Sequence, residues 1–445
     1  MVSASNFVSV DKKTLSFSVN GFLPKVAVIP VEEEDCNLLE LLVSEGSIVK
    51  EGDVIAKTRG LYIHSSVPGL VTKISPSQYS NGKQGLCVSV ALRGAFSFLG
   101  HKLTPQSWQN YDASTLHLLL RESGIVNTFE KTIPAYTQIK KLSGSASNIV
   151  VLRLFDCDPS YITESFLSKK YLAEVVEGSA ILARAFHATS LVIAYSVTDS
   201  SNIKEDLEKL LTPEKKAALF ESQSSSSVEV FSIGLDTRKY PAGTMHDIAQ
   251  AVKKTYKSDV FSKLGKKDLF VDSLTAFNTY NAVVLRKPVV DTLVHVTGDC
   301  LKAAALLNVR IGTSLRDIVE QCGGFKRKLS KIVINGIISG TAVSSLDIPI
   351  SRSVKSVEFI PVGQVRAQGT DKCVRCGNCR KICPVHLWPG NLYRIAHLQG
   401  NISASDELSY KSSLLCTECG LCNTVCSSRL PLCQTISLLK DSYHE

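Results

Sequence analysis

The sequence predicts a multidomain protein in which β and parallel α/β (Rossmann-like) domains precede an all-α C-terminal domain. Three observations lead to this prediction. Short strand patterns broken by glycine and proline fill residues 36–92, apolar runs alternate with helical patterns over residues 115–262, and two cysteine motifs lie within residues 373–426. The chain has 445 residues, enough for about three domains of roughly 150 residues each.

The first domain is expected over residues 1–110. Gly46, Gly52 and Gly69 mark turns between alternating apolar positions, a pattern typical of short antiparallel strands. The segment resembles the barrel-sandwich hybrid fold of biotinyl and lipoyl domains. Those domains present a modifiable lysine on a tight hairpin, and no lysine stands at the matching tip of this sequence. We therefore expect a scaffold rather than a swinging arm.

The second domain is expected over residues 111–285. Residues 148–155, 190–197 and 228–233 are apolar runs of strand length. Such runs, when helices separate them, indicate a parallel sheet that is covered on both faces. The helical patterns lie at residues 169–186, 202–220 and 244–254.

A small third domain is expected over residues 286–362. Gly312-Thr313-Ser314 precedes an amphipathic stretch that ends at Gly323-Gly324, which is typical of a helix capped at both ends. Residues 332–336 and 356–361 have strand patterns. This segment resembles the SLBB module, a ubiquitin-like β-grasp domain.

The C-terminal domain, residues 363–445, is expected to be an α-helical ferredoxin domain. Eight of the fourteen cysteines of the chain form two C-x2-C-x2-C-x3-C motifs here. In such motifs three thiolates hold one [4Fe–4S] cluster, and the fourth ligates the other cluster. The first cluster would use Cys373, Cys376, Cys379 and Cys426, and the second would use Cys416, Cys419, Cys422 and Cys383.

Zinc is the alternative metal for these cysteines. Zinc takes four ligands, commonly from two separate C-x2-C pairs, and the third and fourth cysteine of each motif argue against it. Thirty-two residues lie between Cys383 and Cys416, which is too long for a compact ferredoxin hairpin and favours a helical domain. Cys433 follows the second motif closely, but we expect it not to be a ligand.

Composition and charge exclude several classes of function. The formal net charge is +9, but the basic residues are scattered, so nucleic-acid binding is not indicated. This charge would suit an acidic redox partner, an anionic membrane face or an ordinary solvated surface. No apolar run approaches the ~20 residues of a membrane span, and the first residues lack the pattern of a signal peptide. Any membrane association is expected to be peripheral.

The order of these four units resembles the C subunit of Rnf-type electron-transport complexes over nearly the whole chain. It is also similar to the A subunit of sodium-pumping NADH:quinone reductases and to the flavin- and NADH-binding subunit of complex I. Among these three families, the C-terminal segment with its two cysteine motifs favours the Rnf subunit. Besides the cysteine motifs, the resemblance is carried by Ile63-His-Ser-Ser-Val-Pro-Gly69, Tyr240-Pro-Ala-Gly243, Val296-Thr-Gly298 and Ile311-Gly-Thr313.

The resemblance implies an oxidoreductase subunit that lies peripherally on the cytoplasmic face of the bacterial inner membrane, bound to membrane subunits of an ion-translocating complex. It also implies FMN as a cofactor and electron exchange with NADH or a soluble carrier such as ferredoxin or flavodoxin. The family holds its flavin and nucleotide on a glycine-rich loop, G-I-V-G-L-G-G-A-G-F-P. The matching segment, from Gly124 to Pro134, keeps both ends and lacks the internal glycines.

Without those glycines, Phe129 and Ile133 would crowd a phosphate and Glu130 would repel it. Gly124, Asp156 and Asp158 are the remaining candidates for the flavin and NADH site, although both aspartates also suit a strand-end turn.

Four readings of function stay open. The first is an Rnf C subunit with an altered FMN and NADH pocket. The second is a flavin-free relay whose clusters exchange electrons with flavodoxin or ferredoxin, and the missing glycines favour it. The third is an assembly subunit, against which the intact cysteines argue. The fourth is a protein similar to a corrin reductase, which would be expected to keep the glycine loop.

Overall fold

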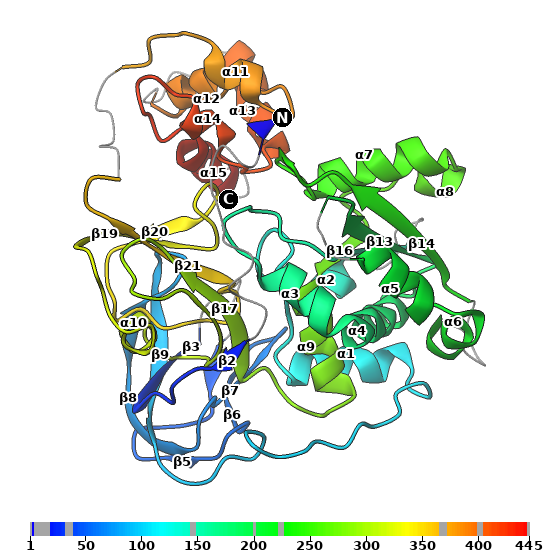
Figure 1. Cartoon of the computed structure of the whole chain (residues 1–445), viewed down its shortest axis with the longest axis vertical. Coiled ribbons are helices and arrows are strands. Elements are labelled where there is room, and N and C mark those ends of the chain that lie inside the picture. The colour runs from blue at the N-terminus through cyan, green and yellow to red at the C-terminus, as the bar shows by residue number, and fades with distance from the viewer. Residues whose placement is uncertain are drawn as a thin grey trace.

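The computed structural model describes residues 2–3, 18–31, 39–142, 148–198, 202–220, 227–364, 372–397 and 404–442. Figure 1 shows the units in the predicted order, with the β-rich N-terminal part below, the α/β domain at one side and the helical domain at the top. In the part of the chain that the structure describes, no helix is both long and apolar enough to span a bilayer.

The N-terminal unit is a pair of facing sheets, as the turn pattern predicts. One sheet has the strand order β3-β9-β8-β5 and the other has the order β4-β6-β7. Ala27, Ile29, Val88 and Val90 point inward and are fully buried, so alternate residues of β3 and β9 supply the core. The strands are β3 (Val26–Pro30), β4 (Glu40–Leu41), β5 (Ile48–Val49), β6 (Val54–Lys57), β7 (Tyr62–His64), β8 (Gly69–Gln78) and β9 (Gln84–Leu92).

The α/β domain has a parallel sheet of order β14-β13-β12-β16. Every residue of its central strands β12 and β13 is buried because helices cover both faces, which confirms the predicted sheet. The strands are β12 (Ile149–Arg153), β13 (Ser190–Ser196), β14 (Glu229–Leu235) and β16 (Leu269–Asp272).

Helices α4 and α9 pack on one face of this sheet, and α7 packs on the other. The helical pattern predicted for residues 202–220 is confirmed, and it forms two helices with a break before Pro213. The helices are α1 (Ala113–Glu122), α2 (Ala135–Leu142), α3 (Thr163–Lys170), α4 (Leu172–Ala185), α5 (Ile203–Leu210), α6 (Pro213–Phe220), α7 (Met245–Tyr256), α8 (Asp259–Ser262) and α9 (Ser273–Val283).

The third unit is a sheet of order β2-β18-β17-β21-β19-β20 with one helix. The Ser314 hydroxyl accepts a hydrogen bond from the Asp317 N–H, and Gly323 has a φ of 80° just beyond the helix, so both predicted caps are confirmed. The elements are β2 (Val19–Asn20), β17 (Asp291–Thr297), β18 (Ala305–Arg310), α10 (Leu315–Gln321), β19 (Leu329–Ile334), β20 (Thr341–Val343) and β21 (Ser356–Pro361).

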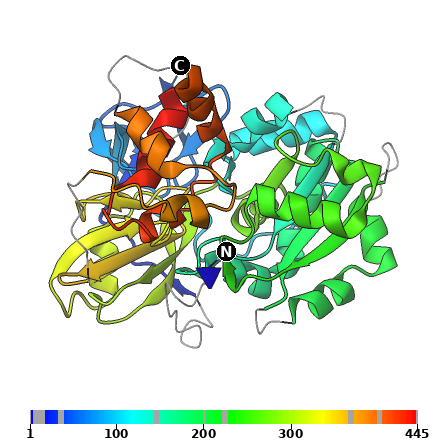
Figure 2. The same cartoon turned by 90° about the horizontal axis from the view of Figure 1, so that it is seen from above.

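In Figure 1 the helical domain lies beside the end of the third unit that carries β19 and β20, and in Figure 2, seen from above, it lies over the same unit. A short N-terminal strand, β1 (Val2–Ser3), pairs with β15 (Lys239–Tyr240) of the α/β domain. The helical elements are α11 (Asn378–Ile382), α12 (Pro389–Ala396), α13 (Ala404–Ser412), a 3-10 turn (Ser413–Leu415), α14 (Leu421–Thr424) and α15 (Leu432–Ser442).

Candidate functional site

The two cysteine motifs have the same local backbone, displaced by 43 residues. Arg375 and Glu418 correspond at this offset and both have a φ of 55°. The next glycines, Gly377 and Gly420, have φ values of 77° and 72°, and a short helix starts after each. Positive φ values let the chain turn back within each motif, so that its thiols face one centre. The helical domain is therefore an approximate internal repeat.

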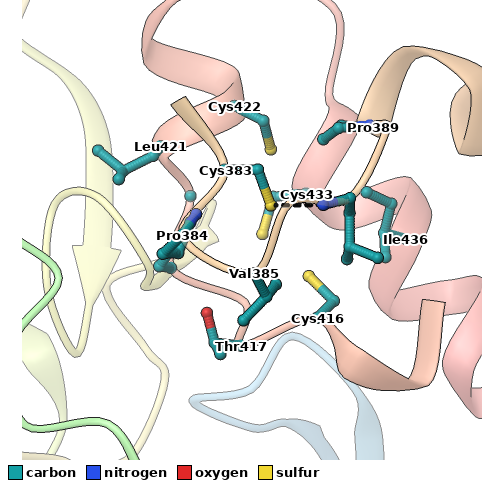
Figure 3. A pocket seen from close by; sticks show the side chains of 13 residues that line it. Cys383, Pro384, Val385, Pro389, Cys416, Thr417, Leu421, Cys422, Cys433 and Ile436 are labelled. Atoms are coloured by element: carbon teal, nitrogen blue, oxygen red, sulfur yellow. Dashed lines mark hydrogen bonds between the residues drawn. The ribbon is translucent and has the colours of Figure 1, made fainter. Parts of the chain in front are cut away.

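The thiols of the second motif line a cavity together with one thiol of the first motif. The cavity lies between the start of α14 and the start of α15 and is closed on its other sides by apolar residues such as Ile436. Figure 3 shows the sulfur atoms of Cys383, Cys416 and Cys422 pointing into this space. The cysteines that line it are Cys383, Cys416, Cys419, Cys422 and Cys433.

The first motif forms a matching centre. An ideal Cβ built on Gly390 would lie 3.5 Å from both Cys373 Sγ and Cys379 Sγ, so these two thiols converge on the N-terminal turn of α12. Cys426 of the second motif packs in the same cluster as these two cysteines. Cys376 Sγ lies 3.6 Å from the hydroxyl of Ser427, the residue next to Cys426. Cys383 thus lines the cavity of the second motif, and Cys426 packs in a cluster with Cys373 and Cys379 to which Cys422 and Cys433 also belong.

Backbone N–H groups point at the exchanged sulfurs. The Leu387 N–H donates to Cys383 Sγ at 3.3 Å, and its counterpart at the 43-residue offset, the Leu430 N–H, donates to Cys426 Sγ at 3.4 Å. Such N–H groups stabilise a thiolate and tune a cluster that it binds. Among the described residues, no three Cys, His, Asp or Glu side chains converge closely enough to hold a single metal ion. The eight thiols fit the donor set of two [4Fe–4S] cubanes.

The second centre faces the other domains of the chain. A Cβ on Gly420 would lie 2.3 Å from the Ile338 carbonyl oxygen of the third unit, so a glycine is needed for this close approach. The Tyr240 hydroxyl of the α/β domain donates to the Cys419 carbonyl at 2.7 Å. The second centre is thus fixed against two neighbouring domains.

The first centre faces outward. Cys376 is exposed, and two apolar side chains near it are exposed as well, Val374 at 65% and Trp388 at 52%. Between residues 372 and 397 the chain has no aspartate or glutamate. We call the following exposed side chains the basic face: Lys372, Arg375, Arg380, Lys381 and Arg429.

The segment that corresponds to the glycine-rich loop is a closed hairpin. It consists of β10 (Val126–Asn127) and β11 (Ile133–Pro134), which pair antiparallel. Phe129, between them, is buried, with its ring 5.5 Å from the Phe270 ring and 4.2 Å from the Arg153 guanidinium carbon. An aromatic side chain therefore fills the space at the carboxyl edge of the sheet, where α/β domains hold their ligands.

Two N–H groups of this hairpin have partners inside the chain. The Thr128 N–H donates to Thr275 Oγ1 at 3.0 Å, and the Phe129 N–H donates to Asn127 Oδ1 at 3.1 Å. A phosphate-binding loop needs such donors to be free to face the ligand. Here they stabilise the hairpin instead.

A buried ion-pair network occupies the rest of the crevice. Lys355, which precedes β21 in the third unit, reaches into the α/β domain. Its Nζ lies 2.6 Å from Asp272 Oδ2, 2.5 Å from Glu164 Oε1 and 2.7 Å from the Thr128 carbonyl oxygen. Arg153 Nη2 lies 3.1 Å from Glu164 Oε2, and all four charged side chains are buried. Two cations and two carboxylates thus neutralise one another across the domain boundary.

The pKa values of Asp272 and Lys355 agree with an ionised pair, whereas burial raises the pKa of Glu164 above its ordinary value. Burial alone would raise the pKa of Asp272, but Lys355 and Arg153 lower it to about 2. Burial alone would lower the pKa of Lys355, but Asp272 and Glu164 raise it above its ordinary value. At neutral pH, Lys355 and Asp272 are therefore charged and paired.

The three candidate residues for a flavin site have structural contacts. Gly124 has a φ of 75°, and a Cβ there would lie 2.7 Å from the Tyr62 carbonyl oxygen of the barrel. Asp156 accepts hydrogen bonds from the N–H groups at positions 164 and 165, at the start of α3. Asp158 accepts from the N–H and the hydroxyl of Ser160. These contacts are typical of strand-end turns. With Phe129 and Lys355 in the crevice, the residues present do not fit FMN there.

Four protein-family models match the chain in the order of its domains. An RnfC barrel sandwich hybrid domain matches residues 13–94, and a Nuo51 FMN-binding domain matches residues 120–272. An SLBB domain matches residues 293–336, and a 4Fe-4S dicluster domain matches residues 369–430. The predicted fold and the two clusters are thereby confirmed, with residue types at the α/β crevice that differ from a flavin site.

The curated relatives are components of membrane complexes. The C subunit of the proton-translocating ferredoxin:NAD(+) oxidoreductase complex of Clostridium ljungdahlii is 26% identical over 83% of this chain and 78% of the relative. The C subunit of the ion-translocating oxidoreductase complex of Methanosarcina acetivorans is 25% identical over 89% and 86%. The Na(+)-translocating counterpart of Acetobacterium woodii is 21% identical over 84% and 81%.

Solved structures of NAD+-reducing [NiFe]-hydrogenase are more distant. The H2-reduced form has a TM-score of 0.49 at 14% identity and covers 76% of this chain and 62% of its own. The family assignment therefore rests on the sequence relatives and the family models. The chain is therefore similar, over more than four fifths of its length and in four matched domains, to the C subunits of Rnf-type ion-translocating oxidoreductase complexes.

Proposed function

We propose that this chain is a flavin-free electron relay of an Rnf-type complex, working between a soluble electron carrier and membrane subunits. The two sets of four cysteine thiols carry the proposal, because [4Fe–4S] clusters transfer single electrons. The relatives are named as subunits of ion-translocating oxidoreductase complexes, which supports membrane subunits as partners. A peripheral place on the cytoplasmic face of the inner membrane is part of the same proposal.

The ligand sets follow from the repeat. Cys373, Cys376 and Cys379 hold the first cluster with Cys426 as the fourth ligand. The second cluster has the reciprocal set of Cys416, Cys419, Cys422 and Cys383. The packing of Cys426 beside the first motif and of Cys383 in the cavity of the second motif supports this exchange. One cluster then faces the solvent, and the other lies against the α/β and third domains.

The side chains in the crevice oppose flavin binding. A bound FMN phosphate would have to displace Phe129 and compete with Asp272 and Glu164 for Lys355. Removing Lys355 from its partners would leave Asp272 without its buried cation and Glu164 with Arg153 alone, which costs about 3–5 kcal/mol. The α/β domain therefore acts as a support for the clusters, since its hairpin and its ion pairs fill the crevice.

We expect the anaerobically purified chain to release no FMN on denaturation. Addition of NADH is expected to leave its visible absorption unchanged, because the side chains of Phe129 and Lys355 occupy the crevice. Dithionite is the positive control, since it reduces the clusters without a protein site. One flavin per chain, together with bleaching by NADH, would contradict the flavin-free relay and favour a pocket that forms around the cofactor.

Electrons are proposed to enter or leave through the first cluster. The basic face surrounds it, and the exposed Val374 and Trp388 add an apolar contact of the kind found at the centre of docking patches. An acidic carrier such as a flavodoxin or a ferredoxin complements this charge and would be steered toward the cluster.

Charge reversal on the basic face is expected to slow the carrier. In the double variant Arg380→Glu, Lys381→Glu we expect reduction of the clusters by reduced flavodoxin to be about tenfold slower at low salt. The difference should shrink at high ionic strength because salt screens surface charges. Stopped-flow absorption measures the rate. The matched control is Lys253→Glu, Lys254→Glu, exposed on α7, and an equal loss in that control would reject docking at the basic face.

A further inference from the structure

Cys433 lies beside the second cluster without being needed to complete its ligand set. The sequence gives it no ligand spacing, yet its side chain lines the same cavity as Cys383 and the thiols of the second motif. It is 9% exposed, and Figure 3 shows it next to Cys383 and Ile436. The cavity therefore has five cysteines, one more than a [4Fe–4S] cluster takes as ligands.

The internal repeat shows which way this thiol points. At the 43-residue offset, Cys433 of α15 corresponds to Gly390 of α12. A Cβ on Gly390 would touch Cys373 Sγ and Cys379 Sγ, each at 3.5 Å. The corresponding sulfurs of the second centre are Cys416 and Cys422. The Cys433 side chain thus occupies, beside the second cluster, the place that Gly390 leaves without a side chain beside the first.

Local contacts hold Cys433 in this position. The Cys433 N–H donates to Asn423 Oδ1 at 2.9 Å. The Nδ2 of the same Asn423 side chain donates to Gln434 Oε1 at 2.8 Å. Asn423 follows Cys422 in the chain, so this bond ties the start of α15 to the ligand itself. Cys433 and Cys422 line the same cavity and pack in the same cluster, so their side chains are neighbours.

We propose that the Cys433 S–H donates a hydrogen bond to the Cys422 sulfur and thereby raises the reduction potential of the second cluster. The inference rests on the proposed ligand sets. A thiolate bound to iron has no proton to give, so Cys433 must be the donor of the pair. A donor to a ligand sulfur stabilises the more negative, reduced cluster, and hydrogen bonds to the sulfurs are among the factors that set cluster potentials.

This hydrogen bond would give the two clusters different reduction potentials, although the backbone around them is repeated. The exchanged sulfurs of both centres accept one matching backbone N–H each, from Leu387 and Leu430. Cys433 adds a thiol donor at the second centre, where its counterpart Gly390 offers none at the first. The side-chain donor at the first centre is the Ser427 hydroxyl, 3.6 Å from the exposed Cys376 Sγ. A higher potential at the second cluster favours electron flow from the outward-facing cluster to the one at the domain junction.

The test is an EPR-monitored redox titration of the anaerobically purified full chain and two variants. Cys433→Val keeps the size of the side chain and removes the donor, and we expect it to lower the midpoint potential of one cluster while about eight irons per chain remain. Cys433→Ser keeps a donor and should move the same potential much less. Gly390→Cys introduces a fifth thiol at the first centre. We expect it to raise the potential of the first cluster, which Cys433→Val leaves unchanged.

The outcomes separate this inference from the proposed function. Unchanged potentials in Cys433→Val would overturn the donor role, and so would the loss of about four irons, which would make Cys433 a ligand. A wild-type chain that holds no iron would instead overturn the proposed function itself. A shift of both potentials by the same amount would also reject the inference, because it would indicate a general change in the domain.

Discussion

Cys383→Ala is expected to remove the second cluster, although this cysteine belongs to the first motif. Its sulfur lines the cavity of the second motif, so its loss leaves that cluster with three ligands. Iron should fall from about eight to about four per chain, because a cubane that loses a thiolate is readily lost. Cys426→Ala is expected to remove the first cluster for the same reason.

Reference variants identify which cluster is lost. Cys376→Ala affects only the first centre and Cys419→Ala only the second, so their EPR spectra show each remaining cluster alone. The spectrum of Cys383→Ala should match that of Cys419→Ala. The comparison is repeated in the Cys433→Val background, because Cys433 lies in the same cavity and is a candidate to replace the missing thiolate. A match to Cys376→Ala instead would show that each motif holds its own cluster.

The cysteine centres could be predicted from the sequence because their chemistry is local. Three of four ligands lie within seven residues in each motif, and the spacing alone implies a cubane and an exchanged fourth ligand. The same is true of the capped helix α10, whose Ser314 and Gly323 are signals within a few residues of its ends. Patterns of this kind are read correctly because the interacting residues are close in sequence.

The closed crevice could not be predicted in this way. Lys355 is separated from Glu164 by 191 residues and from Asp272 by 83, and it stands in a strand-like segment with no pattern that marks it as buried. The missing glycines raised doubt about a flavin, but only the fold shows which side chains take its place. The repeat that pairs Cys433 with Gly390 was present in the sequence, and a comparison of the two halves could have found it.

Lys355→Met is expected to destabilise the protein by about 3–5 kcal/mol. Methionine fills a similar volume, so the main change is that Asp272 and Glu164 lose a buried cation. Without Lys355, these two carboxylates repel one another in an interior of low dielectric constant, which lowers the stability of the folded protein. Because Lys355 comes from the third unit and its partners from the α/β domain, the loss should also loosen the contact between these domains.

Urea unfolding measures the change in stability, and hydrogen exchange at β12 and β16 locates it. A chain with several domains and clusters need not unfold in one step, so exchange at the two strands that carry Arg153 and Asp272 is the more direct observable. Lys326→Met, exposed in the same unit, is the control and should change stability by less than about 0.5 kcal/mol. Protection should fall in Lys355→Met and persist in the control.

The same variant distinguishes a structural lysine from one kept to bind an anion. A buried lysine whose role is to bind a phosphate has no partner in the empty protein, so its burial is unfavourable. Substituting such a lysine lowers the amount of bound ligand, while the stability of the protein stays the same or rises. Lys355 instead already has two carboxylates and a carbonyl oxygen as partners, so its three donors are used. Unchanged stability in Lys355→Met, together with loss of a bound flavin, would show that the crevice opens for a cofactor. A large loss of stability in a chain without flavin would show that this network has taken the place of one.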